Sequence, residues 1–191
     1  VNKNMRISVS PVAPMRTIEY VGKPEDLPRN QYKEYRSTLQ MYHHSYSMQK
    51  KFMHTFRHRY EFRWQENQNN LGDYRFFTRY RIRYRLRYMI NKDNFYQDGV
   101  WYAMASNELG LNIGKSVVMN TFNQNRFYLG MGYRFGNTIR TELRYVNRFR
   151  TRGSTGFEFD GNKGFMFALY VDQVSGISFR KDKLPPVRLY D

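Results

Sequence analysis

The sequence predicts an all-β fold, a transmembrane antiparallel up-and-down β-barrel of about eight or more strands with an arginine-rich lumen. One observation is a two-residue alternation of apolar and charged side chains, as in RYRIRYRLRY at Arg79–Tyr88. A second is an aromatic content of 18% in a chain whose mean hydropathy is only −0.82. A third is that no run approaches the roughly 18 apolar residues that a spanning helix needs.

The first four strands are expected at Met5–Val12, Glu34–Tyr42, Phe52–Gln65 and Tyr74–Ile90. The third and fourth place rings on one side and charges on the other. Soluble strands commonly run about 5 to 6 residues, whereas a tilted spanning strand needs about 9 to 11. The fourth strand is long enough to cross a hydrocarbon layer and project beyond it.

The last four strands are expected at Trp101–Ile113, Arg126–Phe135, Thr138–Arg148 and Lys163–Ser175. Gly136 and Asn137 offer a tight hairpin turn between the sixth and seventh strands. The connectors at Gln65–Gly72 and Thr151–Asn162 are rich in Asn, Gly, Gln, Ser and Thr. All connections are consistent with antiparallel hairpins.

The chain is expected to divide into a barrel at residues 1–175 and a basic, proline-containing extension at residues 176–191, where the alternation is lost. It opens Val-Asn-Lys-Asn, with neither an initiator Met nor an apolar secretory stretch. We therefore expect the sequence to begin at a processed or truncated end, with room for further strands upstream. The extension could dock a partner.

In lipid every backbone N–H and C=O must be paired, so the strands are expected to close into a barrel with the arginines inside. The predicted lumen charge ladder comprises Arg57, Arg59, Glu61, Arg63, Arg79, Arg81, Arg83, Arg85, Arg87, Glu108, Arg126, Arg134, Arg140, Glu142 and Arg144. The same register adds Glu34, Arg36, Arg75, Arg148 and Asp172. Fifteen arginines then face five acidic residues, a formal excess of ten positive charges. Such a lumen should be wet or hold anions.

The opposite side is expected to meet lipid, with rings forming girdles at the membrane interfaces. The predicted lipid-facing aromatic residues are Phe56, Tyr60, Phe62, Trp64, Tyr80, Tyr84, Tyr88, Trp101, Phe127, Tyr133 and Phe135.

Four segments together resemble a known family: HTFRHRYEFRW (His54–Trp64), YRFFTRYRIRYRLRY (Tyr74–Tyr88), WYAMASNELGLNIG with its lone Glu108, and NQNRFYLGMGYRFGNTIRTELRYVNRF (Asn123–Phe149). They are similar to outer-membrane β-barrels of unknown function found in Bacteroidetes. The resemblance covers about Met5 to Val174, and it implies an outer-membrane barrel and little about activity. The chain departs from the family pattern at both ends, because family members have additional strands upstream and the basic tail lies beyond the last strand.

We expect a non-enzymatic integral outer-membrane protein of a Gram-negative bacterium, a structural or accessory subunit of a cell-envelope assembly. Its expected partners are outer-membrane lipid, lipopolysaccharide and other outer-membrane proteins. No cofactor and no metal are expected. Cysteine is absent from the sequence, which excludes disulfides and cysteine-ligated metal sites. A small anion-selective pore is the first alternative, although about eight strands leave an interior only as wide as its side chains.

A soluble β-sheet with its rings in the core, including a nucleic-acid-binding domain, is the second alternative. The formal net charge of +16 favours an anionic partner. However, a period of two sends rings and arginines to opposite faces, so one bound strand could not contact both. We therefore expect no nucleic acid.

A lipid hydrolase using His43 and Ser45 as base and nucleophile is the third alternative. The signal is weak, because no third orienting residue is evident and the segment reads as a turn before Phe52. His54 and His58 are expected to be interface rings.

Other polar and glycine positions are given structural roles. Asp98, Asp160 and Asn162 are expected in loops. Gly130 and Gly132 are expected to make room for bulky arginines.

Overall fold

The computed structural model describes residues 4–18, 31–47, 49–67, 70–115, 117, 120–136, 138–151 and 158–171. These residues form eight β-strands and no helix. Consequently, no helix in these ranges could cross a membrane. The described residues do not include the expected extension at residues 176–191. They also do not include Asn137 or Asp172.

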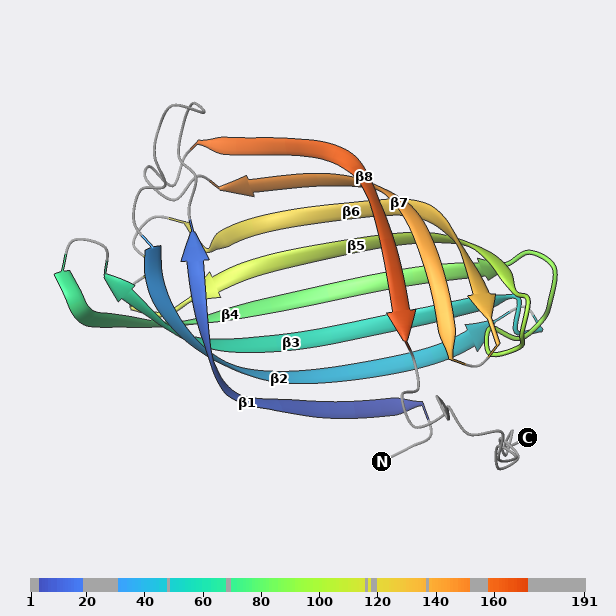
Figure 1. Ribbon diagram of the computed structural model, residues 1–191, viewed down its shortest axis with the longest axis horizontal. Helices are drawn as coiled ribbons and strands as arrows, with labels where there is room; N and C mark the ends of the chain where they lie inside the picture. The colour runs from blue at the N-terminus through green and yellow to red at the C-terminus, as the bar shows by residue number, and fades with distance from the viewer. Residues whose placement is uncertain are drawn as a thin grey trace, which may run out of the picture.

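The eight strands form one antiparallel sheet in which each strand pairs with the next along the chain (Figure 1). They are β1 (Met5–Ile18), β2 (Gln31–Ser47), β3 (Phe52–Asn67), β4 (Asn70–Met89), β5 (Trp101–Ile113), β6 (Phe122–Phe135), β7 (Ile139–Thr151) and β8 (Phe159–Val171). The all-β, up-and-down prediction is confirmed. The positive φ of 57° at Gly136 agrees with the expected turn between β6 and β7.

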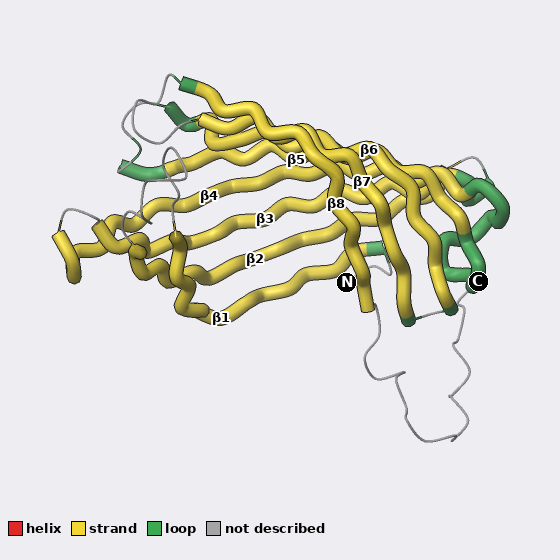
Figure 2. The backbone as a smooth tube through the Cα atoms, turned by 45° about the horizontal axis from the view of Figure 1, so that its top comes forward, coloured by secondary structure: helices red, strands yellow, loops and turns green. Residues whose placement is uncertain are grey.

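The sheet curves strongly but does not close into the expected barrel (Figures 1 and 2). Strands β1 and β8 are its two edges, and no backbone pairing joins them among the described residues. The alternation of side chains specifies which face is buried, but it contains no information on whether the last strand meets the first. An even number of antiparallel strands leaves β1 and β8 running in opposite directions, so their free edges are compatible with antiparallel pairing.

Three polar segments expected to be turns or loops belong to strands. His43 and Ser45 lie in β2, where they pair in register with Phe56 and His54. Strands β3 and β4 extend through most of the connector expected at 65–72. Asp160 and Asn162 lie in β8, opposite Arg150 and Arg148. Ladder hydrogen bonds need no apolar side chain, so loss of alternation does not end a strand.

One end of the interior contains the buried apolar cluster of the described residues. It comprises Met53, Met89, Phe95, Val100, Tyr102 and Met104. Phe95 comes from the loop at residues 90–100 between β4 and β5, and its ring lies 4.7 Å from the Arg87 guanidinium and 5.4 Å from that of Arg134. The loop is held by a hydrogen bond from the backbone N–H of Trp101 to Asn91 Oδ1, 2.9 Å long. The loop thus places an aromatic ring inside the sheet.

The expectation that Gly130 and Gly132 make room for bulky arginines is wrong. A Cβ at Gly132 would collide with the Tyr102 ring, and a Cβ at Gly130 would collide with the β7 backbone at Leu143 and Arg144. The glycines instead permit close approach of a buried tyrosine and of a neighbouring strand.

We expect Gly132→Ala to lower the free energy of unfolding by about 1–3 kcal/mol, because the added methyl overpacks the Tyr102 ring. Gly161→Ala is the matched control, since a Cβ there meets no atom within 4 Å. Denaturant titration of both variants in detergent measures the difference. Equal stability of the two variants would contradict the close packing of Tyr102 against β6.

Candidate functional site

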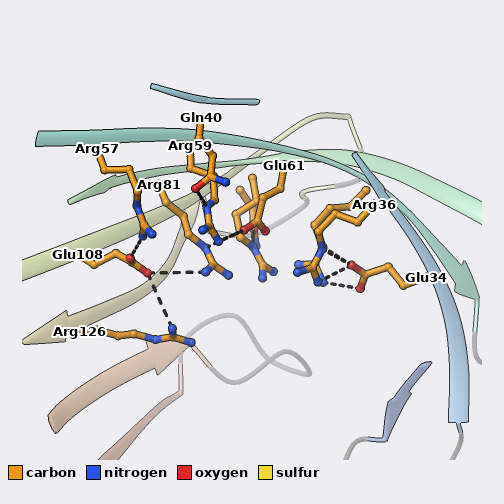
Figure 3. Close-up of polar contacts among 12 residues, drawn as sticks. Glu34, Arg36, Gln40, Arg57, Arg59, Glu61, Arg81, Glu108 and Arg126 are labelled. Carbon is orange, nitrogen blue, oxygen red and sulfur yellow. Dashed lines mark hydrogen bonds and ion pairs between the residues drawn. The ribbon is translucent and has the colours of Figure 1, made fainter. Parts of the chain in front are cut away.

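The candidate site is a set of buried glutamates, each shared by at least two arginines on the concave side of the sheet; Figure 3 shows Glu34, Glu61 and Glu108 with their partners. Four glutamates from four different strands carry it: Glu34 of β2, Glu61 of β3, Glu108 of β5 and Glu142 of β7. Their exposed fractions are between 0% and 3%. A carboxylate this deeply buried requires charged partners, and each of these glutamates has at least two.

Glu34 binds two arginines. Its Oε1 lies 2.6 Å from Arg36 Nη2 and accepts a 2.8 Å hydrogen bond from Arg63 Nε. Arg63 also contacts Oε2 through Nη2, so its guanidinium binds both carboxylate oxygens. This bidentate geometry is the strongest form of an arginine–carboxylate pair.

Glu61 and Glu108 are connected through one arginine. Arg81 Nε lies 3.5 Å from Glu61 Oε1, and its Nη1 lies 3.7 Å from Glu108 Oε1. Arg57 also pairs with Glu108, and Arg126 Nη1 lies 3.8 Å from Glu108 Oε1. The contacts therefore run continuously from β3 through β4 and β5 to β6.

Glu142 stands beside the apolar cluster and has the most partners. It pairs with Arg144 at 2.5 Å, Arg140 at 3.4 Å and Arg87 at 3.9 Å. The Tyr102 hydroxyl donates to Glu142 Oε1 over 2.8 Å. One carboxylate thus gathers groups from β4, β5 and β7.

Further arginines bind neutral oxygens or stack on rings. Arg79 Nε donates to Asn112 Oδ1 over 2.8 Å, and Arg59 Nε donates to Gln40 Oε1 over 2.9 Å. The Arg140 guanidinium lies 4.2 Å from the centre of the Tyr170 ring. Packing and hydrogen bonding therefore supplement the limited number of carboxylates.

Positive charge exceeds negative charge on the inner side. By the pairing register, five acidic residues face inward, namely the four glutamates and Asp160. Seventeen arginines face the same way: Arg6, Arg36, Arg57, Arg59, Arg63, Arg75, Arg79, Arg81, Arg83, Arg85, Arg87, Arg126, Arg134, Arg140, Arg144, Arg148 and Arg150. Among the described strand residues the formal excess is twelve positive charges, which the five acidic residues cannot neutralise.

The structure places every residue of the predicted charge ladder on this inner side, but it does not connect them all. Arg134 stacks on Phe95 and Tyr96. Arg83 and Arg85 make no hydrogen bond or ion pair with a described residue. The alternation therefore locates the side on which a residue lies but not its partner.

Sequence reasoning missed several aromatic residues of the interior, among them Tyr102, Tyr170 and Phe95. Tyr102 and Tyr170 occupy inward positions of β5 and β8. The two-residue alternation that placed Glu108 on the inner side could therefore have placed them there as well. Phe95 lies in a loop without alternation, and no signal in the sequence indicated that its ring would be buried.

The outer side presents rings in register. The pairs Phe52–Tyr88, Phe56–Tyr84, Tyr60–Tyr80 and Trp64–Phe76 join β3 to β4, with ring centroids 4.7 to 5.1 Å apart. Trp101 and Tyr133 form a similar pair between β5 and β6, at 4.8 Å. All eleven aromatic residues predicted to face outward lie on this side. The side chains of Phe165 and Phe167 are 81% and 68% exposed.

The outer side also carries a short polar chain, but it does not join the predicted pair His43 and Ser45. Ser47 Oγ lies 2.7 Å from His54 Nε2, and His54 Nδ1 lies 2.8 Å from the Tyr84 hydroxyl. His58 makes the same contact with Tyr80, at 2.7 Å. Within the described ranges, no cluster of His, Asp and Glu could hold a metal ion.

We expect Glu142→Gln to lower the free energy of unfolding by about 3–5 kcal/mol, because Arg87, Arg140 and Arg144 would lose their common buried counter-charge. Asp73→Asn, at an exposed position of β4, is the matched control and should change stability by less than about 0.5 kcal/mol. Denaturant titration in detergent gives both values. A Glu142→Gln protein as stable as the parent would refute a stabilising role for the shared carboxylate.

The sequence profile of a family described as "Protein of unknown function (DUF2490)" matches residues 1–157 of the 191-residue chain. No curated protein and no solved structure matches the chain. The family description assigns no activity, cellular location or source organism. Because the matched region covers more than half of the sequence, the chain belongs to the family "Protein of unknown function (DUF2490)".

Proposed function

We propose that the chain is a closed transmembrane β-barrel in the outer membrane of a Gram-negative bacterium. In this proposal it serves as a non-enzymatic structural or accessory subunit of a cell-envelope assembly. The observation that carries the proposal is the segregation of side chains. Every strand arginine with a described side chain faces the concave side, while large apolar side chains remain exposed on the convex side. Water disfavours such an apolar surface, whereas lipid favours it.

Strand length supports the same proposal. The strands contain 13 to 20 residues, and a tilted strand needs about 9 to 11 to cross the hydrocarbon layer. The free edges of β1 and β8 would each expose unpaired backbone groups, which lipid tolerates poorly. We therefore propose that β1 and β8 pair in the membrane and complete the barrel.

The interior favours a structural role over an anion-selective pore. Conduction requires a continuous water path, but Phe95 and Tyr102 are buried at one end, at 3% and 0% exposure. The glutamate–arginine contacts cross between strands in the middle of the sheet. An eight-stranded barrel is about wide enough for side chains to fill. The outer rings would contact outer-membrane lipid, lipopolysaccharide or other outer-membrane proteins.

We expect Leu129→Arg to lower the free energy of unfolding by about 2–4 kcal/mol, because Leu129 would face lipid. The substitution should also reduce the amount of protein recovered in the outer membrane. The Leu129 side chain is 54% exposed, so in a soluble protein the same change would alter stability by less than about 0.5 kcal/mol. Gln97→Arg, at an exposed position of the loop between β4 and β5, is the control and should behave like the parent.

Membrane fractionation, and gel mobility with and without boiling, provide the measurement. The parent should fractionate with the outer membrane and migrate differently when boiled, because closed barrels resist unfolding in detergent. A parent chain that is monodisperse in detergent-free buffer would refute the proposal.

The outer polar chain favours one second candidate, a lipid acyl hydrolase. In it, Ser47 Oγ would attack an ester carbonyl while His54 Nε2 takes its proton and Tyr84 orients the imidazole. His54 would then protonate the leaving alcohol, and water would hydrolyse the acyl-serine. The repeated His58–Tyr80 contact, which has no serine, favours ring packing as the simpler role of these histidines.

This second candidate predicts that purified protein hydrolyses a labelled phospholipid and that Ser47→Ala abolishes the reaction. Ser45→Ala, on the same side of β2, should leave the rate unchanged. Product release is followed in mixed micelles. Absence of hydrolysis by the parent, or full activity of Ser47→Ala, eliminates the candidate.

A further inference from the structure

Two neighbouring arginines inside the sheet stand outside the shared-carboxylate contacts. Arg83 and Arg85 lie two positions apart on β4 and face the interior. The Nε atoms of both are buried without a hydrogen-bond partner. Arg85 is only 5% exposed. A buried guanidinium without a paired counter-charge is costly, so Arg85 in particular requires a partner that the described residues do not supply.

A third unsatisfied donor lies beside them. Ser106 of β5 is the register partner of Arg85. Its hydroxyl is buried without a hydrogen-bond partner, and the residue is 2% exposed. Buried hydroxyls are nearly always hydrogen-bonded in folded proteins. Ser106 and Arg85 therefore present adjacent free donors toward the same side of the sheet.

Nearby acidic residues do not satisfy these donors. The charge of Glu108 acts on Arg83, and the charge of Glu142 acts on Arg85. No ion pair forms in either case, and each glutamate already pairs with three other arginines. Arg57 adds further positive charge beside Arg83. The position thus combines free donors with uncompensated positive charge.

We propose that Arg83, Arg85 and Ser106 form a binding site for a phosphate-type oxyanion inside the sheet. The planar guanidinium groups offer several N–H donors in a fork that matches tetrahedral oxyanions, and charge-assisted hydrogen bonds of this kind are strong. The serine hydroxyl adds a neutral donor for a third oxygen. A bound dianion would offset both arginine charges, whereas a water molecule would satisfy a donor but no charge.

The site does not depend on membrane insertion, because it is built from β4 and β5, which pair over their central residues. The phosphate could be free in solution or part of an esterified headgroup. These two sources share the chemistry that the site recognises. They are distinguished by titrating inorganic phosphate and glycerol 3-phosphate separately.

The test is isothermal titration of the full chain in a neutral, phosphate-free detergent. We expect saturable binding of inorganic phosphate or glycerol 3-phosphate at one site per chain, weakened by sodium chloride. Tighter binding of inorganic phosphate indicates the free anion, and tighter binding of glycerol 3-phosphate indicates an esterified headgroup. Arg83→Gln, Arg85→Gln and Ser106→Ala should each weaken binding, the two arginine variants by at least about ten-fold.

Arg75→Gln is the matched control, because Arg75 lies on the same side of β4 at an exposed position, with Gln65 as its partner. Its affinity should equal that of the parent. Phosphate should also raise the melting temperature of the parent but not that of Arg85→Gln. Failure of both ligands to bind the parent, or unchanged binding by the arginine variants, would overturn the proposal.

Discussion

The structure depends on the sharing of few buried carboxylates among many arginines. An isolated buried guanidinium or carboxylate loses several kilocalories per mole of hydration, and only close pairing recovers it. Glu34, Glu61, Glu108 and Glu142 each hold at least two guanidinium groups and come from different strands. Each carboxylate therefore fixes the relative positions of neighbouring strands as well as compensating charge. Arg81 connects two of them and extends the network across the sheet.

This interior dictates the character of the outer surface. Side chains of a strand alternate between faces, so committing one face to arginine leaves the other as the place for apolar groups. Cross-strand ring pairs such as Phe56–Tyr84 and Tyr60–Tyr80 then stabilise the register from outside. If β4 slipped by one residue against β3, its side chains would move to the opposite face. Its rings would then enter the interior, and its guanidinium groups would face outward. The same register is therefore specified twice, once by charge and once by aromatic packing.

The two-residue alternation in the sequence predicted most of the strands and the face of the sheet on which their side chains lie. It placed Arg57, Glu108 and Glu142 on the inner side, because successive side chains of a strand point to opposite faces of the sheet. It could not extend β2 through His43 and Ser45, since polar side chains on both faces hide the alternation while the backbone ladder continues. It could not place Phe95, whose burial depends on the path of a loop. Nor could it decide whether β1 meets β8, because closure depends on accumulated twist and tilt rather than on any local pattern.

Arginine suits this interior better than lysine because its side chain packs against other interior side chains as well as carrying a positive charge. Among the described strand side chains, the inner side holds seventeen arginines and no lysine, while Lys33 and Lys163 occupy outer register positions. A guanidinium is flat, so it can lie over a ring, as Arg63 does on Phe77 at 5.1 Å and Arg140 on Tyr170 at 4.2 Å. It can also bind two carboxylates at once through separate nitrogens. An ammonium group is compact and strongly hydrated, so a lysine-lined interior would need more water and would link fewer strands.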